Sequence, residues 1–425
     1  MKHTGMHTHP PHHDRSRPEW PDTNDGKAVG KSQDNIAHFL ERIGAEVYTD
    51  AFAARQLIAR DGTIAPLDDA AMLRLYFDAD ALGLKAPREY FRDCIANIAN
   101  GDRRNAVRDA IDRLQWDGRE RLDGWLVRHA GGRDVEYERA AFRLGIVAMV
   151  RRVRQPGCKF DQILVLEGPQ GGGKSSLLRI LAGGADYFTD ALPIGADDRQ
   201  TLEIAHGKAI VELGELAGIG IRDLSHVKAF ASRQSDRARL AYGRSVTEVP
   251  RQFTIWGTTN DNEYLRDPTG NRRFWPLTVG RIDLEQARRD RDQLIAEAAA
   301  IEATGEAITL PESLWGEAAE AQQARLLSDT WEDAVAAKLA SVREPAVKVA
   351  TADVLTALGV TLEKQDRTAQ MRVAGILRRL GFEPRQMGRS RLKGWVRGEA
   401  GEAVRIVCSD KGGDFRKAFE HGGDA

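Results

Sequence analysis

Residues 166–181 of the chain read LEGPQGGGKSSLLRIL, a glycine-rich segment followed by a Lys-Ser pair and an apolar run. Gly168 to Ser175 match the pattern G-x-x-x-x-G-K-[ST], whose backbone N–H groups surround phosphates at the positive end of a helix. An apolar run at 163–166 predicts a strand before the loop, and the spacing of apolar residues in SSLLRILAGG predicts a helix after it. This strand–loop–helix order favours a nucleoside-triphosphate site over a glycine-rich turn with a chance Lys-Ser pair.

The loop residues have expected parts in that site. The predicted nucleotide-binding residues are Gly168, Pro169, Gln170, Gly171, Gly172, Gly173, Lys174, Ser175 and Ser176. Lys174 is expected to reach the β- and γ-phosphates, and the Ser175 hydroxyl is expected to ligate Mg²⁺. Because no N-K-x-D motif for guanine is present, the expected cofactors are ATP and Mg²⁺.

Composition limits the classes of protein that are compatible with the chain. It has 425 residues, of which 42% are hydrophobic and 29% charged, and its formal net charge is −1. Contact with nucleic acid must therefore come from local basic patches. The three cysteines form no CxxC pair, which excludes a disulfide framework or a zinc ribbon. Because the sequence has neither an apolar run of about 20 residues nor a signal-peptide core, we expect a cytoplasmic protein without membrane contact.

The pattern along the chain predicts an α/β protein with six segments. These are a disordered, His-rich arm at 1–33, a mostly helical N-terminal domain at 34–140, an ATPase core at 141–281, a helical connector at 282–330, a small winged-helix-like domain at 331–400, and a tail at 401–425. The arm has too little apolar content to offset the entropy of ordering. The core alternates apolar runs with helical segments, as a parallel sheet with crossover helices does.

Two acidic residues follow the next apolar run after the loop. In HGKAIVELGEL, Ala209 to Val211 predict a short buried strand, with Glu212 at its end and Glu215 three residues later. A phosphate-binding loop needs an acid at the end of a second strand to hold Mg²⁺ and orient water. We expect Glu212 in the metal shell and Glu215 in water activation, but the sequence alone does not order the two roles.

Polar and basic residues follow a third predicted strand. In RQFTIWGTTN, a strand at 253–256 leads to Asn260, whose amide is expected to contact the γ-phosphate or the attacking water. Arg272 and Arg273 follow a Gly-Asn turn in DPTGNRRFWPLTV. An arginine on a protruding turn can stabilise transition-state charge on a neighbouring subunit's nucleotide. Either residue is therefore a candidate arginine finger.

A basic insert, VKAFASRQSDRARLAYGR, lies between the second and third strands. Its YGRS turn, with β-compatible flanks, predicts a hairpin that points away from the sheet. Basic side chains interleaved with an aromatic one suit the phosphate backbone of single-stranded DNA. The candidate DNA-binding residues are Lys228, Arg239, Tyr242 and Arg244. The alternative for Arg237, Arg239 or Arg251 is a place in a subunit interface or in the ATP site.

The order of these segments resembles the virulence-associated protein E family, whose members are phage- and mobile-element-borne ATPases related to superfamily 3 helicases. The matching segments are the loop, IVELGEL, VKAFASRQSDRARLAYGR, PRQFTIWGTTN and YLRDPTGNRRFWPL, preceded by WDGRERLDGWL and RQPGCKFDQ, over roughly residues 90–280. The resemblance implies an AAA+-like core that forms a homo-oligomeric ring, expected to be a hexamer, with ATP at subunit interfaces. It also implies Asn260 as a sensor, a finger in the GNRRF turn and a hairpin on single-stranded DNA.

Two further expectations concern partners. Many relatives are fused to a primase or encoded beside one, but the short N-terminal region here has no primase acidic motif, so priming activity is not carried over, and whether a separate primase is a partner stays open. A second basic cluster consists of Arg372, Arg378, Arg379, Arg385, Arg389, Arg391, Lys393 and Arg397. In a winged helix this cluster would bind duplex DNA. The alternative is that the domain only caps the fold and that the basic residues form a solvated face.

Two functions are compatible with these features. The first is an ATP-driven helicase or translocase that replicates the DNA of a phage or mobile element. The second is an ATP-dependent DNA-binding initiator, or a defence-related switch, whose hydrolysis controls assembly without unwinding. A kinase with the same loop would leave Asn260, the Arg272–Arg273 turn and the basic insert without a role.

Overall fold

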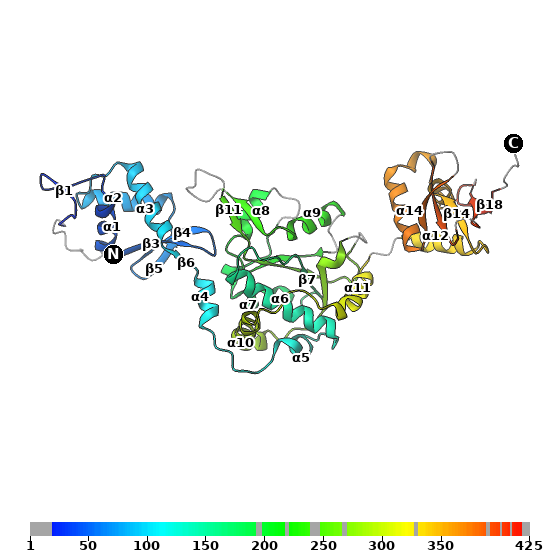
Figure 1. Ribbon diagram of the computed structural model, residues 1–425, viewed down its shortest axis with the longest axis horizontal. Helices are drawn as coiled ribbons and strands as arrows, with labels where there is room; N and C mark the ends of the chain where they lie inside the picture. Colours follow the sequence, from blue (N-terminus) through cyan, green and yellow to red (C-terminus); the bar gives the residue numbers. More distant parts are fainter. Residues whose placement is uncertain are drawn as a thin grey trace, which may run out of the picture. The chain divides into compact units, whose positions relative to one another are not determined.

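The computed structural model describes residues 19–192, 198–216, 221–238, 247–265, 270–326, 330–387, 392–399, 402–408 and 410–418. The chain divides into two compact units, which meet in sequence at Leu326 (Figure 1). The first unit holds an N-terminal module and a core with a parallel sheet, and the second unit is a smaller mixture of helices and strands. The protein is therefore of the mixed α/β class that the sequence predicts.

The N-terminal module is built around a small sheet. Its elements are β1 (Thr23–Asn24), β2 (Lys27–Ala28), α1 (Gln33–Arg42), β3 (Ala45–Asp50), β4 (Arg55–Arg60), β5 (Thr63–Pro66), α2 (Asp69–Ala81), α3 (Arg88–Gly101) and β6 (Arg103–Arg104). The sheet order is β5-β4-β3-β6, and only the β3–β6 pair is parallel. Phe39 of α1, Leu75 of α2 and Phe91 of α3 pack with Val47 of β3 in one hydrophobic cluster.

The N-terminal module differs from the sequence expectation in two places. Residues 19–32 are part of the predicted arm, yet β1 pairs with β2, and Asn35 Nδ2 donates to the carbonyls of Asp22 and Val29 at 2.8 and 3.0 Å. Residues 1–18, with the histidines of the arm, lie outside the described residues. The domain predicted to be mostly helical contains a four-stranded sheet. The Asp-Gly turn at 61–62 joins β4 to β5 and so adds a further strand to the β3–β4 pair.

The core is organised by a five-stranded parallel sheet. Its strands, in the order β13-β7-β12-β9-β8, are β13 (Phe274–Thr278), β7 (Ile163–Glu167), β12 (Thr254–Thr259), β9 (Ile210–Leu213) and β8 (Phe188–Thr189). The core helices are α4 (Ala106–Arg113), α5 (Trp125–His129), α6 (Glu136–Arg154), α7 (Lys174–Ala182), α8 (Asp198–Ala205), α9 (Ile221–Ala231), α10 (Leu284–Ala303) and α11 (Trp315–Gln323). Short 3₁₀ turns are η1 (Leu122–Gly124), η2 (Ala185–Tyr187), η4 (Asn271–Arg273) and η5 (Glu312–Leu314).

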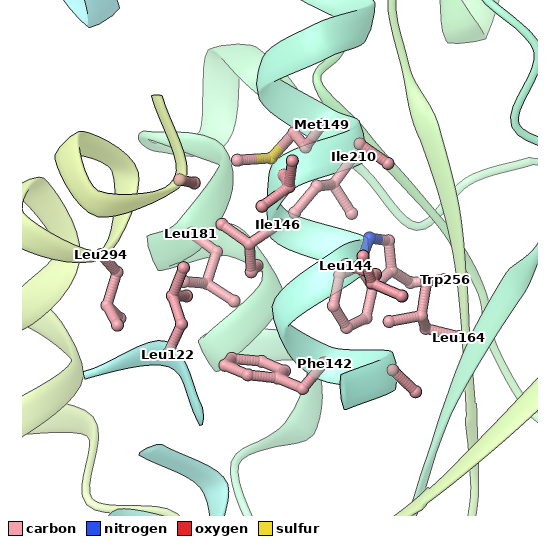
Figure 2. Packing of buried hydrophobic residues seen from close by; sticks show 14 of the residues in the cluster. Leu122, Phe142, Leu144, Ile146, Met149, Leu164, Leu181, Ile210, Trp256 and Leu294 are labelled. Carbon is pink, nitrogen blue, oxygen red and sulfur yellow. The ribbon is translucent and has the colours of Figure 1, made fainter. Parts of the chain in front are cut away.

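Both faces of the parallel sheet are buried, as the continuous apolar run of β7 requires. Leu164 and Leu166 pack with residues of α6, α7 and α10, whereas Ile163 and Val165 pack with residues of α9. This alternation follows from the two-residue period of a strand. In Figure 1, α6, α7 and α10 lie on one side of the sheet. Figure 2 shows the same cluster from close by, with Leu122, Phe142, Leu144, Ile146, Met149, Leu164, Leu181, Ile210, Trp256 and Leu294 labelled.

The core extends beyond the predicted 141–281 at both ends. Ile111 of α4, Trp125 of α5 and Leu294 of α10 share one hydrophobic cluster with Leu164 of the sheet. Trp125 is fully buried, and its Nε1 donates to Asp290 on α10 at 3.0 Å. Helical periodicity predicts an apolar stripe on each of these helices, but not the surface against which the stripe packs. The predicted helical connector at 282–330 is thus largely core.

A two-stranded hairpin stem leaves the core between α9 and β12. It consists of β10 (Ser235–Ala238) and β11 (Thr247–Pro250), which pair in antiparallel register. A buried ion pair holds its base, because Arg251 Nε and Nη2 each donate to the Asp236 carboxylate at 2.6 Å. The Arg251 guanidinium also lies 3.9 Å from the ring centroid of Phe230. Arg251 therefore anchors the stem, and Arg239, Tyr242 and Arg244 lie outside the described residues.

The second unit has its own sheet and hydrophobic core. Its elements are α12 (Thr330–Ala340), β14 (Val347–Ala350), α13 (Thr351–Ala357), η6 (Leu362–Lys364), α14 (Arg367–Arg379), β15 (Glu383–Met387), β16 (Leu392–Arg397), β17 (Val404–Val407) and β18 (Arg416–Lys417). The strand order is β15-β16-β14-β17-β18. The sequence predicts a tail from 401, whereas β17 pairs in parallel with β14 and Ile406 is fully buried. Burial of this short apolar run explains why the segment joins the sheet.

Several arginines of the C-terminal basic cluster make contacts within the second unit. The guanidinium groups of Arg372, Arg378 and Arg397 lie 3.9, 5.2 and 4.9 Å from the ring centroids of Trp331, Trp395 and Phe382. Arg379 forms an ion pair with Glu332 at 2.6 Å. Arg389 and Arg391 lie outside the described residues, as does the Lys393 side chain. These four arginines therefore have structural partners, whereas Arg385 is exposed, and the choice between a structural cap and a surface for duplex DNA stays open.

Within the described ranges, no helix is both long enough and apolar enough to cross a membrane. Cys94, Cys158 and Cys408 are free thiols, in keeping with the absence of a CxxC pair in the sequence.

Candidate active site

The phosphate-loop segment lies where the order of the parallel strands changes direction. β7 is flanked by β12 on one side and β13 on the other. In sequence, β8, β9, β10 and β11 all come between β7 and β12. At such a switch point the connections leave in opposite directions, and a crevice opens beyond the carboxyl ends of the strands. Residues 168–173 join the end of β7 to the start of α7 at this crevice.

Two glycines in the loop are required by the local backbone. Gly173 has φ of 93°, a left-handed conformation that strains side chains with a Cβ, and it caps the N-terminus of α7. A Cβ on Gly168 would lie 2.1 Å from the carbonyl oxygen of Val279, so the loop could not approach the end of β13. The loop is thus held at the amino end of α7, where backbone N–H groups are free for an anion.

Lys174 is the first residue of α7 and points back over the loop. Its Nζ donates to the carbonyls of Gly168 and Pro169 at 2.7 and 2.8 Å, and to Asn260 Oδ1 at 2.9 Å. The residue is only 8% exposed. Burial lowers the pKa of Lys174, and the nearby carboxylate of Glu212 partly opposes that shift. An ammonium group held by neutral acceptors beside a helix N-terminus suits the oxygens of a polyphosphate.

A carboxylate from β9 meets a hydroxyl from α7. Glu212 Oε1 accepts from Ser175 Oγ at 2.7 Å and from Thr258 Oγ1 at 2.6 Å. The other oxygen, Glu212 Oε2, is buried and, among the described residues, has no hydrogen-bond donor. A hydroxyl beside a carboxylate is a donor set that Mg²⁺ accepts when it also has phosphate oxygens and water. Ser175 and Glu212 therefore fit the expected Mg²⁺ site.

Glu215 and Asn260 lie in the loops that follow β9 and β12. Both side chains are exposed, and Asn260 comes directly after the last residue of β12. Glu215 has φ of 52°, which is uncommon for a residue with a side chain. The structure brings Asn260 to Lys174 and Glu212 to Ser175. Glu215, which is exposed, makes neither of these contacts.

The two arginines of the predicted finger lie at the other end of the sheet. They form η4, directly before β13, and Phe274 at the start of β13 pairs with Ile163 at the start of β7. Four strand residues separate that level from the end of β7, or roughly 13 Å. This is longer than an arginine side chain, so neither Arg272 nor Arg273 meets Lys174 of its own chain.

The surroundings of the two arginines differ. Arg273 Nε donates to Ser232 Oγ at 3.1 Å and lies 3.4 Å from Asp161 Oδ2. Arg272 is exposed and lines two neighbouring cavities of about 480 and 550 Å³ beside α11. Arg273 lines the same two cavities, but it is paired with Asp161 and Ser232, so Arg272 is the more exposed and less constrained of the two.

The candidate DNA-binding residues are only partly described. Lys228 lies on α9 and is 9% exposed, with its Nζ near the backbone of Gly270. Its predicted contact with DNA is therefore not supported by its exposure. The remaining three, Arg239, Tyr242 and Arg244, lie outside the described residues.

Sequence reasoning missed a segment that borders the phosphate loop. Val279 N donates to the carbonyl of Glu167 at 2.7 Å, and Ile282 N donates to the carbonyl of Gly172 at 3.0 Å. The segment at 279–283 therefore forms one wall of the loop. The only sequence signal was its place directly after β13, which pairs with β7.

A buried ionic network behind the loop was also missed. Arg325, after α11, donates to both oxygens of Glu167 at 2.6–3.1 Å, and Tyr264 Oη donates to Glu167 Oε1 at 2.7 Å. Glu167 is 3% exposed and Arg325 is 8% exposed. Burial, together with the Glu167 carboxylate, raises the pKa of Tyr264, so its hydroxyl stays a donor. The partners are far apart in sequence, which leaves no local pattern to find.

Loss of one partner of this network should strongly destabilise the first unit. Arg325→Met leaves the Glu167 carboxylate buried without its cation, and we expect the free energy of unfolding to fall by about 3–5 kcal/mol. Urea unfolding followed by tryptophan fluorescence measures this change. The matched control is Arg288→Met, because the Arg288–Glu285 pair is exposed and should contribute less than about 1 kcal/mol. Equal losses for both variants would contradict a buried, cooperative pair.

Comparison with known proteins places the chain in a family. The virulence-associated protein E-like domain matches residues 111–327, just over half of the chain. Among solved structures, the chain is similar to the apo structure of the NrS-1 C-terminal region, with a TM-score of 0.48 and 10% identity over 85% of this chain and 98% of that one. The A-form apo structure of the same region has a TM-score of 0.44 and 12% identity, over 71% and 77% of the two chains. No curated protein matches the chain. The chain belongs to the family of proteins with a virulence-associated protein E-like domain.

Proposed function

We propose that this chain is an ATP-dependent DNA helicase or translocase, which acts in the replication of a phage or mobile element. The observation that carries the proposal is the convergence of Lys174, Glu212 and Asn260 at the switch point of a parallel sheet. These residues come from three separate segments, and Lys174 and Asn260 are 86 residues apart in sequence. Such a set of cation, carboxylate and amide is what phosphoryl transfer from a nucleoside triphosphate needs.

The roles follow from the contacts of each side chain. Lys174 replaces its two loop carbonyls with phosphate oxygens when ATP binds. Glu212, which already accepts from Ser175, would belong to the metal shell, and its buried Oε2, which has no donor among the described residues, would be left to accept from a bound water. Mg²⁺, when bound, neutralises charge on the phosphates. Glu215 is exposed and stays available to orient the attacking water, with Asn260 beside the γ-phosphate.

Hydrolysis is proposed to occur between subunits of a ring. The distance between η4 and the phosphate loop within one chain excludes a finger that acts in cis. A head-to-tail arrangement of subunits brings the η4 side of one subunit to the loop side of the next, and such an interface closes into a ring when its rotation allows. We assign the finger to Arg272, because Arg273 is held by Asp161 and Ser232.

Single-stranded DNA is proposed as the load. The support is the stem β10–β11, which lies between the Glu212 strand and the Asn260 strand in sequence and is held at its base by Arg251 and Asp236. The chain leads from β11 directly into β12, so a change in the contacts of Asn260 with ATP would be passed to the stem. The candidate DNA-contacting residues Arg239, Tyr242 and Arg244 belong to the connection between β10 and β11.

The alternative function is an ATP-dependent initiator or switch that binds DNA without unwinding it. The C-terminal arginines favour neither function, because Arg372, Arg378, Arg379 and Arg397 have partners in their own unit. Unwinding of a duplex separates the two functions.

The first test of the proposal is ATP hydrolysis with and without DNA. We expect single-stranded oligo(dT) to raise the steady-state rate of phosphate release severalfold, because the strand stabilises the stem in one position. A duplex of the same length without a single-stranded end serves as the comparison and should stimulate less. A rate that is the same with and without oligo(dT) would contradict a DNA-driven ATPase.

A further inference from the structure

A cavity of about 540 Å³ lies in the first unit between the N-terminal module and the core. Residues of β3, β4, α3 and β6 line one side, and residues of α6, β11 and the segment after β11 line the other. None of its lining residues belongs to the candidate active site. The volume is within the range of roughly 300–1,000 Å³ that is typical of ligand pockets.

Buried amides hold the two sides of the cavity together. Asn105 Nδ2 donates to Gln252 Oε1 at 3.3 Å, and Gln252 Nε2 donates to the carbonyl of Ala51 at 2.8 Å. Asn105 and Gln252 are each 7% exposed. Because buried amides that are hydrogen-bonded resist displacement, the cavity is preformed rather than a gap between loosely joined parts.

The charge of the cavity is positive. The described residues that line it include four arginines, Arg55, Arg103, Arg108 and Arg154, and one carboxylate, Glu248. Arg154 is neutralised by Asp112 and Glu302. Arg55 and Arg103 are exposed, and no side-chain partner for either lies among the described residues. By contrast, the adjacent Arg104 is paired with Asp102 and Glu46 and does not line the cavity.

The position and polar groups of the cavity favour a nucleic-acid strand over a lone phosphate. Glu248, Val249 and Pro250 of β11 form part of its lining, so the cavity lies at the base of the stem whose connection carries the candidate DNA-contacting residues. Gln56 Oε1 is buried and, within the described part of the chain, lacks a donor. A phosphodiester group offers no donor to that oxygen, whereas every base offers an N–H donor, which in thymine is the ring N3–H.

We propose that this cavity binds a stretch of single-stranded DNA, with Arg55 and Arg103 on the phosphodiester backbone and Gln56 toward a base. The site would hold the strand against the N-terminal module, in addition to the contacts proposed for Arg239, Tyr242 and Arg244. This proposal rests on the proposed function, in which single-stranded DNA is the load.

The test measures binding of fluorescein-labelled oligo(dT) by anisotropy at several salt concentrations. The variant is Arg55→Glu/Arg103→Glu, and we expect its Kd at 0.15 M salt to rise by at least about tenfold, as loss of two phosphate contacts predicts. The slope of log K against log salt should become shallower by about 1.4, because each contact on a single strand contributes about 0.7. The charge-preserving variant Arg55→Lys/Arg103→Lys should keep the slope of the parent chain.

The matched control is Arg74→Glu/Arg88→Glu. Both residues are exposed in the same module, do not line the cavity, and change the net charge by the same amount. An equal loss of affinity in this control would overturn the proposal, because a general field would then explain it. Unchanged affinity and slope in Arg55→Glu/Arg103→Glu would also overturn it, while binding by the parent chain would leave the proposed function standing. A parent chain that does not bind oligo(dT) would contradict both.

A free polyphosphate could also supply phosphate groups to Arg55 and Arg103. Inorganic pyrophosphate is titrated against the complex of the chain with labelled oligo(dT). We expect it to displace oligo(dT) only when it raises the ionic strength to the value at which sodium chloride displaces oligo(dT) as well. If pyrophosphate instead protects Arg55 and Arg103 from an arginine-directed reagent without releasing oligo(dT), the cavity binds a small anion and the proposal fails.

Discussion

Replacement of Lys174 with alanine is expected to lower the rate of ATP hydrolysis by roughly 10²–10³-fold, the loss that follows removal of one preorganised donor from a transition state. The position of the Lys174 ammonium explains the size of this effect. The Lys174 ammonium is the cation that three acceptors of the loop and of Asn260 hold at the start of α7. Steady-state phosphate release, with saturating ATP and Mg²⁺, is the measurement.

The control for Lys174→Ala is Lys208→Ala. The Lys208 ammonium donates to the carbonyl of Asp186 at 2.9 Å and lies outside the candidate site, so this change should leave hydrolysis within about twofold, as surface substitutions usually do. Thermal unfolding of both variants separates loss of chemistry from loss of fold. Hydrolysis by folded Lys174→Ala at the rate of the parent chain would mean that the loop is not the catalytic site.

Replacement of Arg272 with alanine is expected to lower turnover by about 10³-fold while ATP still binds, because an arginine finger acts on the transition state more than on the bound substrate. The contrast with Arg273 makes the prediction specific. Arg273→Ala removes contacts with Ser232 and Asp161 inside its own chain, so it should lower the thermal midpoint. Because the Arg272 side chain is exposed, Arg272→Ala should leave the thermal midpoint unchanged.

Mixing tests whether the finger acts in trans. Arg272→Ala subunits keep Lys174, and Lys174→Ala subunits keep Arg272, so an interface between one of each has a complete site. In a random mixture of equal parts, about a quarter of the head-to-tail interfaces should be complete. Phosphate release by the mixture should therefore exceed that of either variant alone. A mixture no more active than its components would contradict a shared site.

The strand–loop–helix unit and its polar partners could be predicted from the sequence because each has a local pattern. β7, the loop and α7 follow one another, and Glu212 and Asn260 each follow an apolar run that becomes a strand of the same sheet. Parallel strands end at the same edge of a sheet, so these side chains are expected at one edge, whereas only the structure shows the order β7-β12-β9 that brings them together.

The limits of the core depend on contacts that no local pattern shows. The apolar stripe of α10 is visible in the sequence, yet only the structure shows that Leu294 packs with Leu164. Similarly, β17 is a short run that is buried only because β14 lies beside it. The Glu167–Arg325 pair joins residues 158 positions apart. Such partners are chosen by the whole fold rather than by the neighbouring residues.

The choice between Arg272 and Arg273 is of the same kind. The two residues are adjacent in sequence and share a turn, so the sequence treats them alike. Asp161 and Ser232, which come from other segments, hold Arg273 and leave Arg272 exposed.

The central claim is that ATP hydrolysis by this chain moves DNA, and strand displacement tests it most directly. A forked duplex with a fluorophore and a quencher on opposite strands reports separation as a rise in fluorescence. We expect the chain to release the labelled strand only with ATP and Mg²⁺, and Lys174→Ala to release none. Sustained ATP hydrolysis on the same fork with no released strand would contradict the claim and favour the initiator or switch.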